Sequence, residues 1–218
     1  MAHFSALAGC LFLSINSMAQ TTVCLIRGDT VFAGGTDRSC IKSAGKFNFV
    51  FEGPLDTTVT ATINRIAPAS QDFKTFGASC VMAMKALYTD YFSDILRKDP
   101  AYFDLHIMGN QVSTVVGKTC LFGIENNKPV LIYIVFNMNK GVRHPVVISY
   151  SLQQQDFALF SAGDHTRHKG IVGSLPDRGS VGEIKKMIGI ATDGPVDGTG
   201  PPIDVLVVTK KGRMWIRK

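Results

Sequence analysis

Strand-like segments are grouped towards both ends of the chain, and helix-like segments lie between and after them. The strand-like segments are rich in β-branched and aromatic residues and are separated by clusters of Gly, Pro, Asn and Asp, a pattern typical of strands joined by tight turns. They comprise an opening hairpin, a buried strand, a middle group and a closing hairpin. The predicted strands are residues 22–26, 30–33, 47–51, 119–124, 130–136, 146–151, 203–208 and 214–216.

Three helices are predicted. Apolar residues recur at helical spacing after Asp56, which is a typical N-cap residue type. Residues 71–97 contain many good helix formers, and Asp99-Pro100 marks the end of that helix. A third helix is predicted from the Ser180 capping box to about Thr192.

This order of elements predicts a layered α+β architecture, in which two antiparallel sheets pack face to face and helices lie outside them. The chain has 218 residues, of which 45% are hydrophobic and 18% charged. That length and balance favour one domain with a single sizeable core. We therefore expect one domain over residues 21–218.

The N-terminus resembles an export signal. Residues 4–13 form an apolar run that is too short to span a bilayer, and a polar stretch of small residues follows it. Ser17 and Ala19 satisfy the small-x-small rule, so a signal peptide over residues 1–19 is predicted, with Gln20 as the first mature residue. The predicted location is secreted or periplasmic, with no membrane span. The alternative is an N-terminal segment that is disordered or buried in the fold.

The charge pattern indicates a mildly basic surface and not a nucleic-acid site. The chain has 23 Lys and Arg against 17 Asp and Glu, a net charge of +6. These basic residues are scattered and do not alternate with aromatics on one face, so no nucleic-acid partner is expected.

The cysteines predict buried thiols. One of five, Cys10, lies in the predicted signal, and the other four show no CxxC spacing, so neither zinc nor another metal or cofactor is expected. Three disulfide pairings are the alternative in an oxidising compartment. The four remaining cysteines are Cys24, Cys40, Cys80 and Cys120.

Two separated segments resemble the proteasome β-subunit family of the bacterial proteasome type. The first is TTVCLIRGDTVFAGGTDR at residues 21–38, in which Thr21 precedes Asp37 by sixteen residues, the family's spacing. The second is TGPPIDVLVVTKKG at residues 199–212, which is similar to the family's closing loop and hairpin. Together they bracket nearly the whole mature chain.

The resemblance implies the N-terminal nucleophile hydrolase fold, a four-layer αββα sandwich, and a threonine-type amide or peptide hydrolase. Thr21 is then the nucleophile. Its hydroxyl needs a base, and a free N-terminal amine with a pKa of about 7.7–8.0 can serve at neutral pH. Substrates would be peptides or small amides.

The same resemblance implies the supporting site residues. Asp37 matches the family's carboxylate, which holds a lysine near the nucleophile. Lys42 and Lys46 are the candidates for that lysine, and we expect Lys42, because residues 40–42 lie at about the expected distance before Gly53. Gly53 matches the glycine whose backbone N–H stabilises the oxyanion.

Three further residues match less closely. Ser161, in a predicted polar loop over residues 161–169, resembles a serine beside the nucleophile. Asp197 and Thr199 resemble a pair that binds the terminal amine, although Asp197 is one residue out of step. The alternative is a polar loop without a catalytic part.

One departure from the family bears directly on activity. Cleavage after Ala19 leaves Gln20 in front of Thr21, so the Thr21 amine stays in a peptide bond unless Gln20 is also removed. The alternatives are therefore an inactive binding or ring-forming subunit, or a small-molecule amidase on the same fold. A homo-oligomer is expected, because the 71–97 helix carries apolar residues on more than one face.

Overall fold

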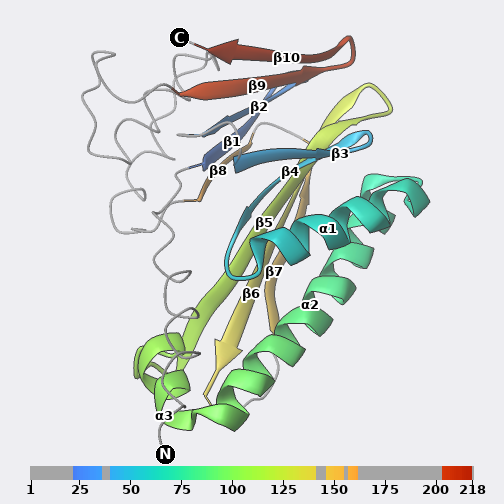
Figure 1. The fold of residues 1–218 in the computed structure, drawn as a ribbon. Coiled ribbons are helices and arrows are strands. Elements are labelled where there is room, and N and C mark those ends of the chain that lie inside the picture. The colour runs from blue at the N-terminus through green and yellow to red at the C-terminus, as the bar shows by residue number, and fades with distance from the viewer. Residues whose placement is uncertain (1–21, 36–39, 141–145, 155–156, 162–202, 218) are drawn as a thin grey trace, which may run out of the picture.

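The chain folds into two five-stranded antiparallel sheets that lie one over the other (Figure 1). The computed structural model describes residues 22–35, 40–140, 146–154, 157–161 and 203–217. The first sheet has the strand order β10-β9-β2-β1-β8, so the opening and closing hairpins of the chain lie side by side in it. Its strands are β1 (Thr22–Arg27), β2 (Thr30–Gly35), β8 (Phe157–Ser161), β9 (Asp204–Thr209) and β10 (Gly212–Arg217).

The second sheet has the order β3-β4-β5-β6-β7 and is built around the long β5–β6 hairpin. Asn126 and Asn127 form the turn of this hairpin, and both have positive φ (49° and 61°), as a twisted two-residue turn requires. The strands of the second sheet are β3 (Ile41–Ala44), β4 (Phe47–Glu52), β5 (Ser113–Glu125), β6 (Lys128–Asn139) and β7 (Val146–Gln153).

Helices cover one face of the second sheet, the face that points away from the first sheet (Figure 1). The long helix α2 begins after Asp72, whose side chain accepts a hydrogen bond from the Thr75 N–H at 2.6 Å. It ends at Lys98, and its C-cap residue Asp99 immediately precedes Pro100, whose ring cannot be accommodated within a continuing helix. The helical segments are α1 (Asp56–Ile66), η2 (Ala67–Ala69), α2 (Phe73–Lys98), α3 (Pro100–Tyr102) and the π-helical η3 (Phe103–Ile107).

The larger apolar core lies between these helices and the second sheet. Phe47 of β4 is 1% exposed, and its ring stacks on Phe76 of α2 with centroids 3.9 Å apart. Phe73 meets the same ring edge-on at 4.8 Å. Most apolar residues of α2 pack into this core, whereas Met82 is 75% exposed.

The second core fills the space between the two sheets. It joins Cys24 and Ile26 of β1 to Cys120 and Phe122 of β5. Neighbouring residues of a strand point to opposite faces, so membership of this core shows which residues of each strand face the other sheet.

All four described cysteines are buried free thiols, which confirms that prediction. Burial raises the pKa of the Cys80 thiol to about 12. Burial, together with the neighbouring Cys24, also raises the pKa of Cys120 well above its usual value. Thiols that remain protonated at neutral pH are poor nucleophiles, so Cys80 and Cys120 are structural.

Most of the predicted elements within the described residues are confirmed, and the α+β class with two antiparallel sheets is confirmed with them. The sequence did not predict the strands β3 and β8. Ser161, which we expected in a loop, is the last residue of β8. The predicted signal peptide and the helix from Ser180 to Thr192 lie outside the described residues.

The hairpin turns of both sheets lie at one end of the layer between them. Arg213, next to the β9–β10 turn, donates a hydrogen bond from Nη2 to the Gly45 carbonyl in the β3–β4 turn at 2.6 Å. The opposite end of β9 is Asp204, which pairs with Gly35, and Gly35 pairs with Thr22. The opposite end of β4 is Glu52, which pairs with Lys118. We call the end containing Thr22, Gly35, Asp204, Glu52 and Lys118 the Thr22 end.

No helix in the described part of the chain is both long enough and apolar enough to cross a membrane.

Tyr88 of α2 is fully buried, and within the described residues its hydroxyl has no hydrogen-bond partner. The hydroxyl lies against two glycines, Gly117 in β5 and Gly53 directly after β4. A Cβ atom added at Gly117 would lie 2.3 Å from it, and one added at Gly53 would lie 3.0 Å from it. Burial also raises the pKa of Tyr88, so the group stays protonated.

Tyr88→Phe is therefore expected to raise the free energy of unfolding by about 1 kcal/mol, because it removes a buried polar group without a partner and keeps the ring packing. Denaturant unfolding of the two proteins measures the change. Gly117→Ala is the contrasting variant and should lower stability, because the new methyl group would collide with the Tyr88 ring. A loss of stability in Tyr88→Phe would show that the hydroxyl is hydrogen-bonded.

Candidate functional site

The start of β1 is held between two neighbouring strands of the first sheet. Thr22 pairs with Gly35 of β2 on one side and with Ser161 of β8 on the other. Thr22 is 5% exposed, and it faces the second sheet because it shares a strand face with Cys24 and Ile26. Thr21 directly precedes this fixed position.

Gly53, the predicted oxyanion donor, follows β4 at the Thr22 end. Its φ of +146° lies in the region that side chains disfavour. An added Cβ would also approach the Val116 carbonyl oxygen and the Phe51 ring to 3.1 Å each. Both the backbone conformation and the space thus require a glycine here, in a turn that packs against Tyr88 of α2 on the helix side of the second sheet.

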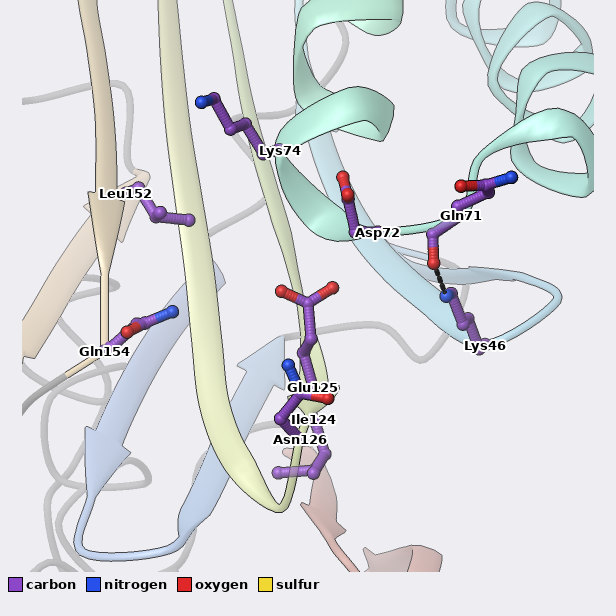
Figure 2. Close-up of a pocket in the computed structure, with 9 residues that line it drawn as sticks. All are labelled: Lys46, Gln71, Asp72, Lys74, Ile124, Glu125, Asn126, Leu152 and Gln154. Atoms are coloured by element: carbon purple, nitrogen blue, oxygen red, sulfur yellow. Dashed lines mark hydrogen bonds between the residues drawn. The ribbon is translucent and has the colours of Figure 1, made fainter.

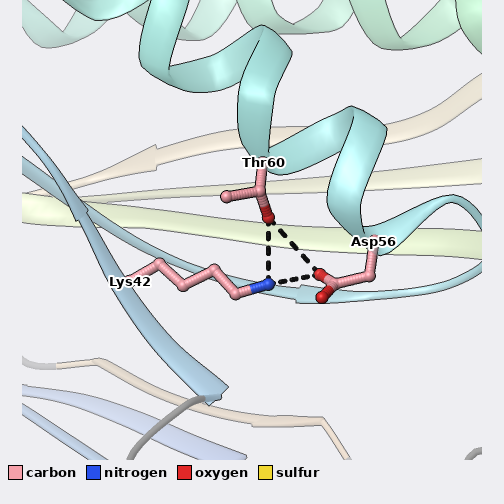
Figure 3. Close-up of polar contacts among 3 residues, drawn as sticks. All are labelled: Lys42, Asp56 and Thr60. Carbon is pink, nitrogen blue, oxygen red and sulfur yellow. Dashed lines mark hydrogen bonds and ion pairs between the residues drawn. The ribbon is translucent and has the colours of Figure 1, made fainter.

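Lys42, the predicted catalytic lysine, lies on the helix side of the second sheet (Figure 3). Its ammonium group donates a hydrogen bond to Thr60 Oγ1 at 2.9 Å and forms an ion pair with Asp56, both on α1. The preceding residue, Ile41, belongs to the core between the sheets, so Lys42 points away from the first sheet.

Lys46, the second candidate, lies in the β3–β4 turn, at the end of the interlayer opposite the Thr22 end. Its ammonium group donates to the Gln71 carbonyl and lies 5.1 Å from the centroid of the Phe47 ring. These contacts attach the turn to the start of α2.

The remaining predicted site residues are described only in part. The backbone of Ser161 lies directly opposite Thr22 in the first sheet. Thr21, Asp37, Asp197 and Thr199 lie outside the described residues.

An ion pair with a buried lysine at the Thr22 end was missed by the sequence analysis. Lys118 Nζ lies 3.4 Å from Glu52 Oε2, with the Lys118 side chain 7% exposed and the Glu52 side chain 39% exposed. Lys118 shares a strand face with Cys120, and Glu52 shares one with Val50, so both point into the layer between the sheets. A lone lysine within the otherwise uncharged run VVGKTCLFGI was the available signal.

Tyr133 of β6 completes the polar groups near this pair. Burial raises its pKa to about 12, and the charge of Glu52 and the nearby Cys120 add to the shift. Tyr133 stays neutral and so does not offset the charge of the ammonium group. In the part of the chain that the structure describes, Glu52 is the carboxylate that pairs with Lys118.

A separate polar pocket of about 510 Å³ opens at the other end of the second sheet (Figure 2). Its two carboxylates cap helix α2. Glu125 Oε1 accepts from the Phe73 N–H at 2.8 Å, and Asp72 accepts from the Thr75 N–H, which holds the pKa of Asp72 below its usual value. Since both acidic groups serve the helix start, this pocket is a structural junction.

Among the described residues, no three His, Cys, Asp or Glu side chains gather closely enough to bind a metal ion. No protein-family model matches the chain, and no curated protein matches it in sequence.

Proposed function

We propose that the protein is an exported threonine-type amide or peptide hydrolase with the αββα fold of the N-terminal nucleophile hydrolases and Thr21 as its nucleophile. The observation that carries the proposal is the position of Thr22. Strand β1, which begins directly after Thr21, is an inner strand of the first sheet, and its start lies at the same end of the two sheets as Gly53. The two stacked antiparallel sheets, with helices outside the second, support the fold.

The chemistry proceeds through an acyl-enzyme. Once Gln20 is removed, the Thr21 amine takes the proton of its own hydroxyl, and Oγ attacks the substrate carbonyl. The Gly53 N–H donates to the oxyanion, and the departing amine takes the transferred proton. Water then hydrolyses the ester by the reverse proton path. Asp37 is the carboxylate of this site in the proposal, and Lys42 as its cation remains a prediction.

Two measurements on the mature protein test the proposal. N-terminal sequencing should give Thr21 as the first residue, and a β-lactone or epoxyketone that targets N-terminal threonine should add its mass to the N-terminal peptide. A persistent Gln20 supports the inactive binding subunit. A chain that begins at Thr21, stays unlabelled and cleaves neither peptides nor simple amides contradicts catalysis. Cleavage of small amides alone identifies a small-molecule amidase.

We also propose that the mature protein forms a dimer or small oligomer. Exposed apolar side chains support this, with Met82 75% and Val112 79% exposed, whereas the other apolar residues of α2 pack largely within the subunit. Light scattering on the mature protein should therefore give a particle of a few subunits. A closed ring of about twelve or more subunits would refute the small oligomer, and a strict monomer would refute any self-association.

A further inference from the structure

We propose that Lys118, held by Glu52, supplies the positive charge that activates Thr21, a role that the resemblance assigns to Lys42. This inference rests on the proposed function. It assigns the charge to a residue of β5, a strand in which the resemblance to the proteasome β-subunit family placed no site residue.

The first support is position along the strands. The hydrogen bond from Arg213 to Gly45 fixes the turns of both sheets at one end, so the starts of β1 and β9 and the end of β4 lie at the other. Lys118 is the register partner of Glu52, the last residue of β4. Lys118 therefore lies at the end of the interlayer where Thr22 begins β1 and Thr21 precedes it.

The second support is the face of the sheet. Lys118 shares the inner face of the second sheet with Cys120, and Cys120 interacts with Cys24 of β1 across the interlayer. Thr22 lies two residues before Cys24 on the same face of β1, just as Lys118 lies two residues before Cys120 on β5. Lys42 lies on the opposite face, where Asp56 and Thr60 of α1 bind its ammonium group.

The third support is burial. A lysine is almost never this buried without a specific partner, and a buried charge acts more strongly on its neighbours than an exposed one. Among the described residues, the acidic groups and the phenol that face this space are Glu52 of β4, Tyr133 of β6 and Asp204 of β9, the last 8% exposed at the start of its strand. Glu52 Oε2 lies 3.4 Å from the ammonium nitrogen, and because its side chain is 39% exposed, water screens the carboxylate charge more than that of the buried lysine.

The charge acts without any transfer of the lysine proton. An ammonium group near the Thr21 amine disfavours the protonated amine, lowers its pKa and leaves more of it available as base. As Oγ loses its proton to that amine and bonds to the carbonyl carbon, the same charge stabilises the negative oxygen that forms. Lys118 keeps its proton throughout, and the leaving amine takes the proton from the Thr21 ammonium group.

The test measures the rate of β-lactone labelling of Thr21 against pH in the mature full-length protein. Lys118→Met should slow labelling and turnover roughly a hundred- to a thousandfold. It should also move the acid limb of the pH profile to higher pH, because loss of the cation raises the pKa of the amine. Lys118→Arg should restore much of the rate. Lys128→Met, at an exposed position on the adjacent strand, should leave rate and profile unchanged.

Glu52→Gln provides an independent measurement, because its partly exposed site tolerates a neutral side chain. Removing this carboxylate should lower the pKa of the amine and move the acid limb to lower pH, opposite to Lys118→Met. A purely structural ion pair would not shift the two variants in opposite directions. If Lys118→Met does not fold, the Glu52→Gln profile decides, and an unchanged profile overturns the proposal.

The proposal is also overturned if folded Lys118→Met keeps the wild-type rate and profile, or if Lys42→Met alone loses activity. Failure of the proposed function is a different result, since a wild-type protein that begins at Thr21 would then remain unlabelled.

Discussion

Thr21→Ala is expected to abolish hydrolysis and covalent labelling, with a loss of turnover on the order of 10⁶-fold, the scale seen when a covalent nucleophile is removed. The effect is this large because the amine and the other groups of the site have no hydroxyl left to activate. The fold should not change, because one hydroxyl at a chain end contributes little packing. Mass spectrometry of the labelled protein and an assay on peptide amides measure the loss.

Thr22→Val is the matched control for this variant. Thr22 is buried and fixed between Gly35 and Ser161, and valine keeps its shape and its backbone pairing. This variant should retain labelling at Thr21. If instead Thr22→Val loses activity while Thr21→Ala keeps it, the nucleophile is Thr22 and the processing site lies one residue later.

Phe47→Ala is expected to lower the free energy of unfolding by about 3–5 kcal/mol, the range for deleting a buried aromatic side chain. Phe47 is 1% exposed and lies between the second sheet and α2, where its ring contacts both Phe73 and Phe76. Its removal leaves a cavity that two fixed neighbouring rings cannot fill. Urea or guanidinium unfolding followed by circular dichroism measures the difference.

Two controls separate the cavity from other effects. Phe47→Leu keeps most of the volume and should cost much less. Met82→Ala, on the exposed side of α2, should change stability by no more than about 0.5 kcal/mol. Similar losses in Phe47→Ala and Met82→Ala would show that the helix and sheet do not share a well-packed core.

Local sequence signals predicted the elements that local physics determines. The opening and closing hairpins follow from β-branched runs around short polar turns, and α2 follows from its helix formers, its Asp72 cap and the stop at Pro100. The strands β3 and β8 were missed. Both are short edge strands, four and five residues long. Each is defined by its pairing with one neighbouring strand, β4 for β3 and β1 for β8, more than by its own composition.

The site residues show the same division. Gly53 was singled out by the resemblance, and its positive φ and crowded surroundings agree with a required glycine. Lys42 and Lys118 could not be ranked in the same way. Spacing along the chain says nothing about which face of a sheet a lysine occupies, and a shift of one residue reverses that face.

By itself, the sequence determined the α+β class, the order of most elements, the buried thiols and the threonine that precedes β1. Only the tertiary structure decided that β9 pairs with β2, that Glu52 and Lys118 lie at the Thr22 end, and that Lys42 turns towards α1. The physical reason is range. Propensity and turn chemistry act over a few residues, whereas sheet register and the burial of a charge depend on contacts between segments up to about 170 residues apart, such as Arg213 and Gly45.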